Sequence, residues 1–397
     1  MSEWKRYKLN EIASLSNGIN FDKSAYTSGV KLIGVADFKD RVYPDYGSLQ
    51  EVDSKVVRNG DYLEKGDIVF VRSNGNKELV GRCMMIDRDI PVTFSGFCIK
   101  LHLIDKNKFE PAYFNYLFRT REFKKVMTGT AVGANIQNLS QSRLGNCEIN
   151  VPNIETQREL AIIISRYDSL IENYQKQIKL LEESAQRLYK EWFIDLRFPG
   201  HENTKIVNGV PEGWEKKSIA DLGTYLNGFA FKPSDWQERG KPIIKIKEMG
   251  NGISTDTPRN NGERVPEKYL IKSGDLLFSW SATLMVIVWT GEEGWLNQHL
   301  FKVTPTQGIG REFLLQSISK TITEFSNLTT GSTMKHIQRN KLEQVFVNTP
   351  TSEIMNCYCR IAERQREQIL NISSQIRHLT EARDRLLPKL MNGEIEM

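Results

Sequence analysis

Apolar residues recur every seven positions along two long segments of the chain. In each segment a second apolar stripe follows three positions after the first. Heptads sustained over this length predict long α-helices that pair as a coiled coil, with charged residues on the outer faces. The residues expected in the helix interface are Ile164, Ile171, Ile178, Leu181, Leu188, Ile369, Ile372, Ile376, Leu379 and Leu386.

The first long helix is expected to begin after Pro152, where Thr156 and Glu159 have the spacing of a capping box. A helix of about 40 residues is about 60 Å long. In the second helix Arg383 interrupts the apolar stripe. Such stripes often mark dimers, so one interpretation is a coiled coil between two copies of the chain. The other is antiparallel pairing of the two helices within one chain, which would hold the flanking modules at opposite ends of a rod.

The rest of the chain is a duplication, which favours pairing within the chain. Residues 4–21 read WKRYKLNEIASLSNGINF, and residues 214–231 read WEKKSIADLGTYLNGFAF. Residues 62–70 resemble residues 269–278, and Ile136-Gln137 matches Ile337-Gln338 inside polar loops. The repeat predicts the order module, helix, module, helix. The expected boundaries are 1–152 for the first module, 153–198 for the first helix, 199–213 for a linker, 214–350 for the second module and 351–397 for the second helix.

Composition and charge narrow the class of protein. A chain of 397 residues suits two domains better than one core. The longest apolar runs, such as residues 284–289, are strand-sized, so no membrane span is expected. Five scattered cysteines and the lack of a secretory signal favour a reducing cytoplasm. The net charge of +5 divides into +4 for residues 1–154 and +3 for residues 214–352, with the remainder at −2. Two basic modules joined by nearly neutral connectors suit a polyanionic partner.

The whole chain resembles the specificity subunit of Type I restriction–modification systems. The resemblance rests on the duplicated order and on two helix ends, RLYKEWFID at residues 187–195 and RLLPKLMNGEI at residues 385–395. It implies an α+β fold with two similar globular target-recognition domains of mixed β-sheet and short helices. These would be separated by two long antiparallel coiled-coil helices in a pseudo-two-fold internal repeat.

The resemblance also implies a function and partners. Each recognition domain would read one half of a bipartite target in double-stranded DNA, while the helix pair sets the unread spacer. Two DNA adenine methyltransferase subunits would dock on the chain, and restriction subunits with motor and nuclease activity would join them. S-adenosylmethionine, ATP and Mg²⁺ are then expected on the partner subunits, with no cofactor bound by this chain.

Three pairs of polar loops are candidates for DNA contact, because arginine and amide side chains recognise base edges and phosphates. The first pair follows apolar strands, and its candidates are Arg72, Ser73, Asn74, Asn76, Lys77, Ser281 and Thr283. The second pair follows Gly129 and Gly331, and its candidates are Thr130, Asn135, Gln137, Arg143, Ser332, Thr333, Lys335, His336, Gln338 and Arg339. The third pair is Asn17 and Asn227, each followed by glycine.

Each pair also has a purely structural interpretation. Asn74-Gly75 is a common hairpin turn, and the second module lacks the arginine of the first at that place. The glycine loops can be capped helix N-termini, although we favour DNA contact there. The aromatic residues after Asn17 and Asn227 are expected in the core, which leaves the asparagines as the candidate contacts.

The sequence argues against most catalytic functions. The chain has no Asn/Asp-Pro-Pro-aromatic motif, no GxxxxGK[ST] phosphate loop and no HExxH zinc motif. Pro44-Asp45 followed by Asp53 and Lys55 is a loose match to a Mg²⁺-dependent nuclease signature. We expect a DNA reader without a catalytic site. The alternative is a coiled-coil scaffold whose two modules bind proteins.

Overall fold

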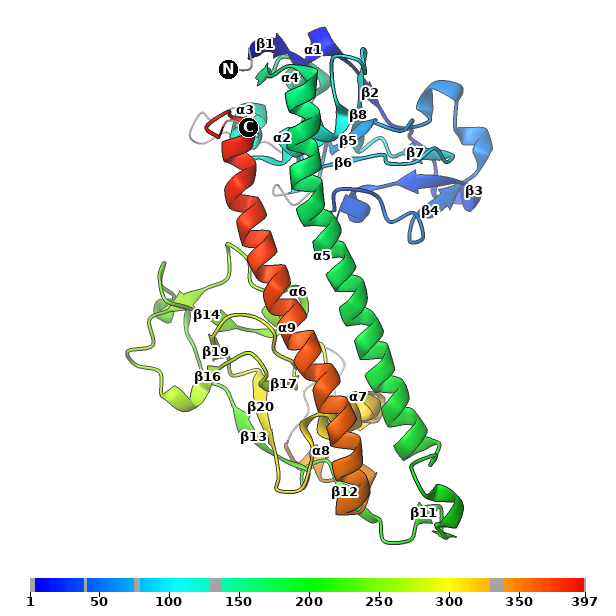
Figure 1. The fold of residues 1–397 in the computed structure, drawn as a ribbon, viewed down its shortest axis with the longest axis vertical. Helices are drawn as coiled ribbons and strands as arrows, with labels where there is room; N and C mark the ends of the chain where they lie inside the picture. Colours follow the sequence, from blue (N-terminus) through cyan, green and yellow to red (C-terminus); the bar gives the residue numbers. More distant parts are fainter. Residues whose placement is uncertain (1–3, 39–40, 75–78, 129–137, 329–338, 396–397) are drawn as a thin grey trace. The chain divides into compact units, whose positions relative to one another are not determined.

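The computed structural model describes residues 4–38, 41–74, 79–128, 138–328 and 339–395. It divides into two compact units, one made of Met1–Glu172 with Leu379–Met397 and the other of Asn173–His378. Two long helices, α5 (Ile154–Tyr189) and α9 (Ser352–Met391), each contribute residues to both units (Figure 1). Among the described residues no helix is long and apolar enough to cross a membrane.

The first unit contains three sheets, whose strand orders are β2-β8-β5-β6, β4-β3-β7 and β1-β9. The pairing within the largest sheet is antiparallel, whereas β3 and β7 run parallel. The strands are β1 (Lys5–Lys8), β2 (Ala13–Asn17), β3 (Tyr26–Ile33), β4 (Gln50–Val52), β5 (Ile68–Val71), β6 (Cys83–Met85), β7 (Val92–Phe94), β8 (Cys98–Leu103) and β9 (Glu148–Val151). The short helices are α1 (Leu9–Ile12), α2 (Pro111–Arg119), α3 (Arg121–Thr128) and α4 (Gln141–Gly145).

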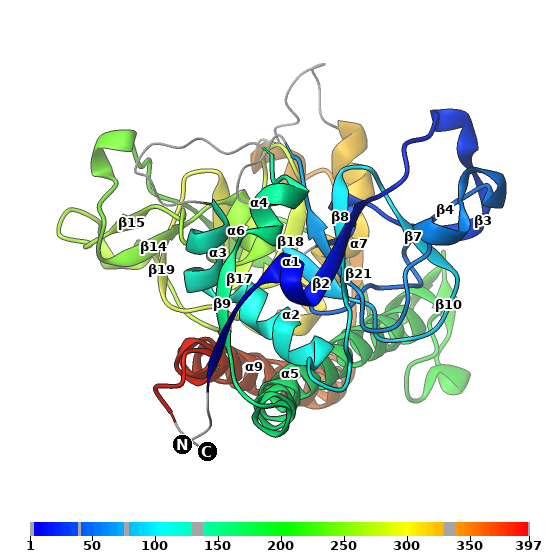
Figure 2. The ribbon, with the colours of Figure 1, turned by 90° about the horizontal axis from the view of Figure 1, so that it is seen from above.

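Strand β5 shows why an uninterrupted apolar run forms the centre of this unit. All four of its residues are buried. Since successive side chains of a strand point to opposite faces, both faces of β5 must be covered. Ile68 and Phe70 belong to the core that includes α2 and the long helices. Val69 and Val71 belong to a second core with Ile33 of the small sheet. The largest sheet is therefore covered on both faces, and Figure 2 shows β2 and β8 between β9 and the small sheet β4-β3-β7.

The second unit repeats this arrangement. Its strand orders are β13-β20-β17-β18, β15-β14-β19-β16 and β12-β21, with a separate β10-β11 hairpin. The strands are β10 (Ile206–Val207), β11 (Val210–Pro211), β12 (Glu215–Ser218), β13 (Gly223–Asn227), β14 (Lys241–Ile244), β15 (Arg259–Asn260), β16 (Leu270–Ile271), β17 (Leu276–Ser279), β18 (Met285–Val288), β19 (Gly294–Leu296), β20 (Leu300–Pro305) and β21 (Phe346–Thr349). The helices are α6 (Ile246–Asn251), α7 (Arg311–Leu328) and α8 (Arg339–Leu342).

The two units agree in register as well as in strand order. Asn17 pairs with Ile99 in the first unit, and Asn227 pairs with Phe301 at the matching place in the second. The parallel pair β3 and β7 is matched by the parallel pair β14 and β19. The predicted fold class, a duplicated α+β chain with two similar modules of mixed sheet and short helices, is confirmed.

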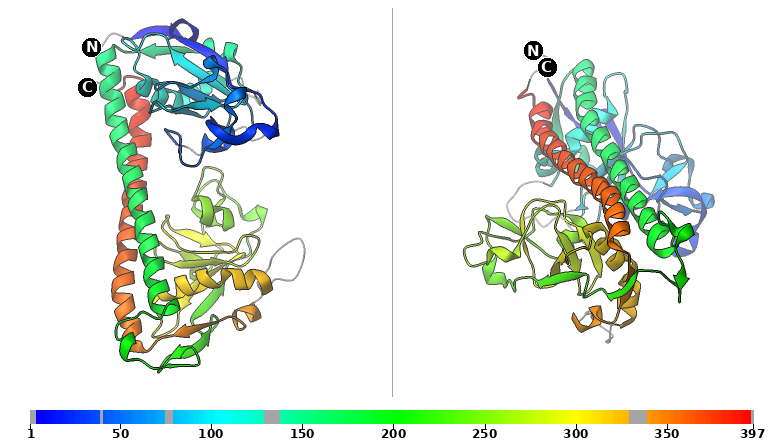
Figure 3. Two further views of the ribbon diagram at one scale, coloured as in Figure 1. Left: turned by 90° about the vertical axis from the view of Figure 1, so that its right-hand side faces the viewer. Right: turned by 60° about the horizontal axis from the view of Figure 1, so that its bottom comes forward.

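In each unit a part of α5 packs antiparallel against a part of α9, on one side of the sheets (Figure 3). In the first unit Ile164 shares a core with Leu387 and Leu390, and Asp168 bonds Arg383. In the second unit Tyr189 lies 6.5 Å from Tyr358 between ring centroids, and Gln365 donates to Ser184. The ten residues expected in the helix interface are all buried or half-buried.

The start of α5 differs from the capping box expected at Thr156 and Glu159. The helix begins at Ile154, and the Asn153 side chain accepts a hydrogen bond of 2.9 Å from the Thr156 backbone N–H. Asn153 is therefore the capping residue, and Thr156 lies within the first turn. Asparagine and threonine side chains both accept such a bond, so residue type alone does not show whether Asn153 or Thr156 is the cap.

Two ion pairs form where the long helices carry charge toward the interior. Arg383, which interrupts the apolar stripe, bonds Asp168 across the helix pair at 2.6 Å. Burial lowers the pKa of Arg383, but its bonds to Asp168 and Asp384 outweigh this and raise it. In the second unit Arg366 of α9 binds Glu312 of α7 with two hydrogen bonds of 2.7 and 3.2 Å. Each arginine lies in an otherwise apolar part of α9, and each is paired there with a carboxylate from another helix.

Candidate nucleic-acid interface

Several loops of the first unit meet at one edge of the sheet β2-β8-β5-β6. Strand β2 ends at Asn17, β5 ends at Val71 and β8 begins at Cys98. Because β2 and β5 both flank β8 and run antiparallel to it, the loops that continue from these three ends emerge together. We call this surface the first loop edge: residues 17–20, 72–74 and 95–97, together with Asn138.

Backbone hydrogen bonds join these segments to one another. The Gly96 N–H donates to the Ile19 carbonyl at 2.7 Å, and the Arg72 N–H donates to the Phe97 carbonyl at 2.8 Å. Ser73 forms a β-bridge with Asn138, next to a bond of 2.8 Å from the Leu139 N–H to the Arg72 carbonyl. The structure thus brings together described parts of all three loops that the sequence singled out in this module.

Gly18 is required at this edge because its backbone is pressed against the turn between β7 and β8. A Cβ at Gly18 would lie 2.3 Å from the carbonyl oxygens of both Phe94 and Ser95. The Asn-Gly sequence that recurs at residues 227–228 has the same cause, since a Cβ at Gly228 would lie 2.2 Å from the Asn297 carbonyl oxygen. Each glycine allows a loop and a turn to lie in contact.

The second unit forms a matching surface, the second loop edge, from residues 227–229, 280–283 and 297–299. The Phe229–Asn297 bridge corresponds to the Ile19–Ser95 bridge of the first unit. The Trp280 indole N–H donates to the Asn227 side-chain oxygen at 3.1 Å. Trp280 occupies the place of Arg72, so the two edges share a backbone plan but differ in their side chains.

The predicted contact residues differ in their exposure. Asn17, Asn227 and Thr283 are exposed, and Arg72, Ser73 and Asn74 are half-buried at the first loop edge. Ser281 is only 5% exposed, so its hydroxyl could reach a base only after a rearrangement of its loop. Arg143 donates from Nε to the Met127 carbonyl at 2.7 Å, which ties it to the end of α3.

Other predicted contacts lie outside the described residues. These are Asn76, Lys77, Thr130, Asn135, Gln137, Ser332, Thr333, Lys335, His336 and Gln338. Arg339 is the first residue of α8, and its side chain is not among those described.

The turns 95–97 and 297–299 belong to the two loop edges but are not among the contacts predicted from the sequence. The prediction relied on glycine-containing loops with arginine, lysine, asparagine, glutamine or serine at matching places in both modules. Ser95-Gly96-Phe97 has only a serine of these, and the matching turn has no glycine. The triple Asn297-Gln298-His299 carries two amide side chains without a glycine, and this amide pair is the signal in the sequence that could identify the turn.

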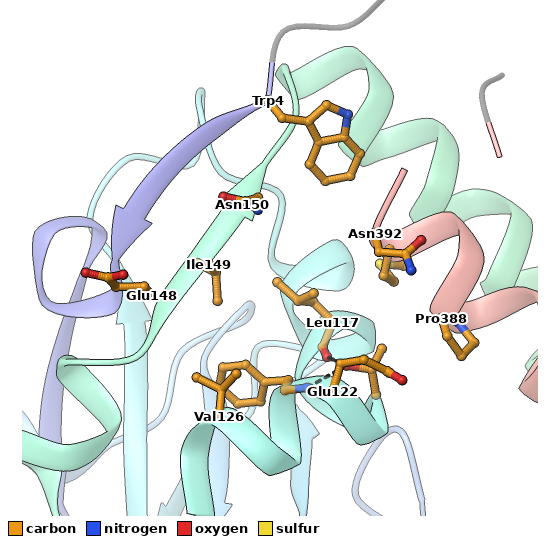
Figure 4. Close-up of a pocket in the computed structure, with 12 residues that line it drawn as sticks. Trp4, Leu117, Glu122, Val126, Glu148, Ile149, Asn150, Pro388 and Asn392 are labelled. Carbon is orange, nitrogen blue, oxygen red and sulfur yellow. Dashed lines mark hydrogen bonds between the residues drawn. The ribbon is translucent and has the colours of Figure 1, made fainter. Parts of the chain in front are cut away.

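A pocket of about 230 Å³ lies in the first unit, between α2, α3, β9 and the end of α9 (Figure 4). Most of its lining is apolar, and Trp4 covers one side. Of the acidic residues at its wall, Glu148 is paired with Arg6. Two carboxylates without a nucleophile or a base do not make a catalytic constellation.

The other candidate catalytic groups are engaged in the fold. Asp45 pairs with Arg41 at 2.8 Å, and this hydrogen bond lowers the pKa of the carboxyl. Asp53 accepts from the Lys55 backbone N–H at 2.9 Å and so caps its own turn. Burial raises the pKa of the Cys98 thiol to about 12 and that of Cys147 to about 11, which makes both poor nucleophiles. The described residues contain no group of three or more potential metal ligands.

Comparison with known proteins points in one direction. The family model for the Type I restriction modification DNA specificity domain matches residues 1–183 and 211–380. The MjaIX specificity subunit of Methanocaldococcus jannaschii is 26% identical over 315 residues, covering 75% of this chain and 72% of that protein. The HindI specificity subunit of Haemophilus influenzae is 24% identical and matches over the full length of both chains.

The fold has a counterpart among solved structures. The crystal structure of the S subunit of a Type I restriction–modification system from M. genitalium aligns with a TM-score of 0.56. The alignment covers 100% of this chain and 97% of that one, at 15% sequence identity. Three findings support the same assignment. They are the two copies of the family domain, the two loop edges with one backbone plan, and the relatives that match over the full length. The chain belongs to the Type I restriction–modification specificity subunits and recognises DNA sequence.

Proposed function

We propose that each loop edge reads one half of a bipartite DNA target and that this chain catalyses no reaction itself. The observation that carries the proposal is the matched pair of edges, which have the same strand order, register and glycine contacts but different side chains. A shared backbone plan suits the common shape of the duplex, and different side chains suit two different half-sites. Methylation and cleavage would then be the work of partner subunits.

DNA binding by the full-length chain with its methyltransferase subunits tests this proposal. We expect affinity for target duplex to fall by about 10³- to 10⁵-fold between 50 and 200 mM salt, if roughly 6–10 phosphates are contacted. Mapping methylated adenines in the host genome would supply the two half-sites and the spacer for the duplexes. Affinity that does not change with salt and does not distinguish target from scrambled DNA would instead favour a scaffold that binds proteins.

We further propose that the outer faces of α5 and α9 dock the two adenine methyltransferase subunits, and that restriction subunits join this assembly. Large apolar side chains on these helices are exposed where a monomeric helix would carry polar residues. Leu180 is 64% exposed, Ile162 is 51% exposed and Ile361 is 44% exposed. S-adenosylmethionine, ATP and Mg²⁺ would bind to those partners, and a cytoplasmic location stays a prediction.

Leu180→Glu is expected to weaken assembly with the methyltransferase subunits at least about tenfold, since it replaces an apolar contact with a charge. Co-purification and analytical ultracentrifugation measure the effect. The matched control is Ile206→Glu, because Ile206 is 52% exposed and belongs to the β10-β11 hairpin, not to either long helix. Equal loss of assembly in both variants, or in neither, would contradict docking on this face.

A further inference from the structure

The turn between β7 and β8 presents an aromatic ring to solvent in the middle of the first loop edge. Phe97 is 61% exposed, whereas the residues on either side of the turn, Phe94 and Cys98, are fully buried. Phenylalanine is usually buried, and exposure of its ring costs free energy in the unbound protein. An exposed ring in a surface expected to contact a ligand therefore points to a contact made on binding.

The backbone of this turn is held in place by hydrogen bonds on both sides of the Phe97 peptide. The Phe97 carbonyl accepts hydrogen bonds from the backbone N–H groups of Arg72 and Ser73, at 2.8 and 3.3 Å. The Phe97 N–H donates to the Ser95 hydroxyl at 3.3 Å, and Cys98 closes the turn with a bond of 2.8 Å to the Ser95 carbonyl. Both backbone groups of Phe97 are thus committed, so its side chain starts from a fixed point on the loop edge.

Gly96 adds a second restraint. Its N–H donates to the Ile19 carbonyl, and a Cβ on it would lie 2.1 Å from the side-chain oxygen of Asn20. The turn and the loop of residues 17–20 are therefore in direct contact. Phe97 therefore follows a glycine that touches the Asn20 side chain, and its turn is not an isolated loop.

The other side chains of the first loop edge indicate which part of DNA the ring would meet. Arg72, Asn74 and Asn17 belong to the same edge, and arginine and asparagine bind guanine and adenine through the major groove. The one apolar group that bases display in that groove is the 5-methyl of thymine, for which phenylalanine is a suitable partner. We infer that Phe97 reads a thymine in the half-site bound by the first unit, by packing against its 5-methyl group. This inference rests on the proposed function, since it requires the first loop edge to bind DNA.

The second loop edge carries a different side chain at the matching position. His299 takes the place of Phe97, is half-buried, and lies 5.8 Å from Trp280 between ring centroids. Its Nε2 lies 3.3 Å from the Gln298 side-chain nitrogen. This turn is polar and partly covered, so thymine reading of this kind is expected in one half-site and not in the other.

The test uses the full-length chain in complex with its methyltransferase subunits and duplexes of the mapped target. Each thymine of the first half-site is replaced singly by deoxyuridine, which keeps the pairing edge and removes only the methyl group. We expect one such position at which the unaltered complex loses about fourfold in affinity, the effect of one buried methyl group. Phe97→Ala should bind the thymine and deoxyuridine duplexes equally, while Phe97→Leu should keep part of the discrimination.

Ile104→Ala is the matched control, because Ile104 is 63% exposed beyond the opposite end of β8 and should leave the discrimination unchanged. The inference is overturned if deoxyuridine has no effect at any position, if the first half-site contains no thymine, or if Phe97→Ala keeps the discrimination. A Phe97-dependent rise in the fluorescence of 2-aminopurine beside the contact would also overturn it, since that reports a ring inserted between bases. Failure of the proposed function is separate, because the unaltered complex would then show no sequence-specific binding.

Discussion

Glu312→Ala is expected to destabilise the second unit by about 3–5 kcal/mol, because it leaves the Arg366 guanidinium buried without its counter-ion. The two side chains are 1% and 5% exposed, and Arg366 binds both carboxylate oxygens of Glu312. Such a pair adds little over a well-packed apolar pair, but the loss of one partner is costly. Denaturant unfolding of the full-length chain, followed by a probe in the second unit, measures the change.

Two further variants separate the effect of the unpaired charge from the loss of packing. Asp256→Ala removes an exposed ion pair with Lys247 in the same unit and should leave the stability almost unchanged, because water screens such a pair. Glu312→Leu combined with Arg366→Met removes both charges and should recover most of the lost stability. A double variant as unstable as Glu312→Ala would show that packing, and not the unpaired arginine, is responsible.

Glu182 of α5 is a second carboxylate near this arginine. Burial raises the pKa of Glu182, although the charge of Arg366 acts in the opposite direction. In the Glu312→Ala variant Glu182 can partly replace the missing counter-ion. Adding Glu182→Gln to that variant is therefore expected to destabilise the unit further.

Gly18→Ala is expected to reduce binding of the first half-site by between about 5-fold and 150-fold, with the second half-site unaffected. A methyl group at this position would overlap the carbonyl oxygens of Phe94 and Ser95, both of which are backbone atoms and cannot rotate away. Separating the loop from the turn costs about 1–3 kcal/mol and displaces the first loop edge. Competition assays with duplexes altered in one half-site at a time measure the two effects separately.

Gly60→Ala is the control in the same unit, because no atom lies within 4 Å of the Cβ it would add. It should leave both half-sites unchanged. Gly228→Ala should produce the opposite result from Gly18→Ala, with loss of the second half-site only, since its Cβ would meet the Asn297 carbonyl oxygen. If either glycine variant weakened both half-sites equally, the assignment of one edge to each half-site would be wrong.

The interruption at Arg383 shows one limit of the heptad pattern. A charged residue in an apolar stripe predicts a weak point in the helix interface, and next to it the sequence offers only Asp384 of the same helix as a partner. The structure brings Asp168, 215 residues away, within hydrogen-bond distance. Ion pairs of this kind depend on the register of two distant helices, which apolar spacing alone does not specify.

The candidate contacts show a second limit. Residue type and glycine spacing identified Asn17, Arg72 and their neighbours, and these do lie at one edge. The same criteria included Ser281, which is buried, and missed Phe97, which is exposed. Local composition describes what a side chain can bind, whereas exposure depends on which loop packs over which.

The sequence by itself determined the duplication, the two long amphipathic helices, the strand-sized apolar runs and the family resemblance. These features depend on local periodicity and on repeated motifs, so they can be recognised without knowledge of any distant contact. Only the tertiary structure decided that the ends of β2 and β5 and the start of β8 meet at one edge, because strand order in a sheet joins segments far apart in the chain. It also decided that Gly18 and Gly228 are needed for close approach of backbones, and that Phe97 is exposed at an edge that also carries amide residues.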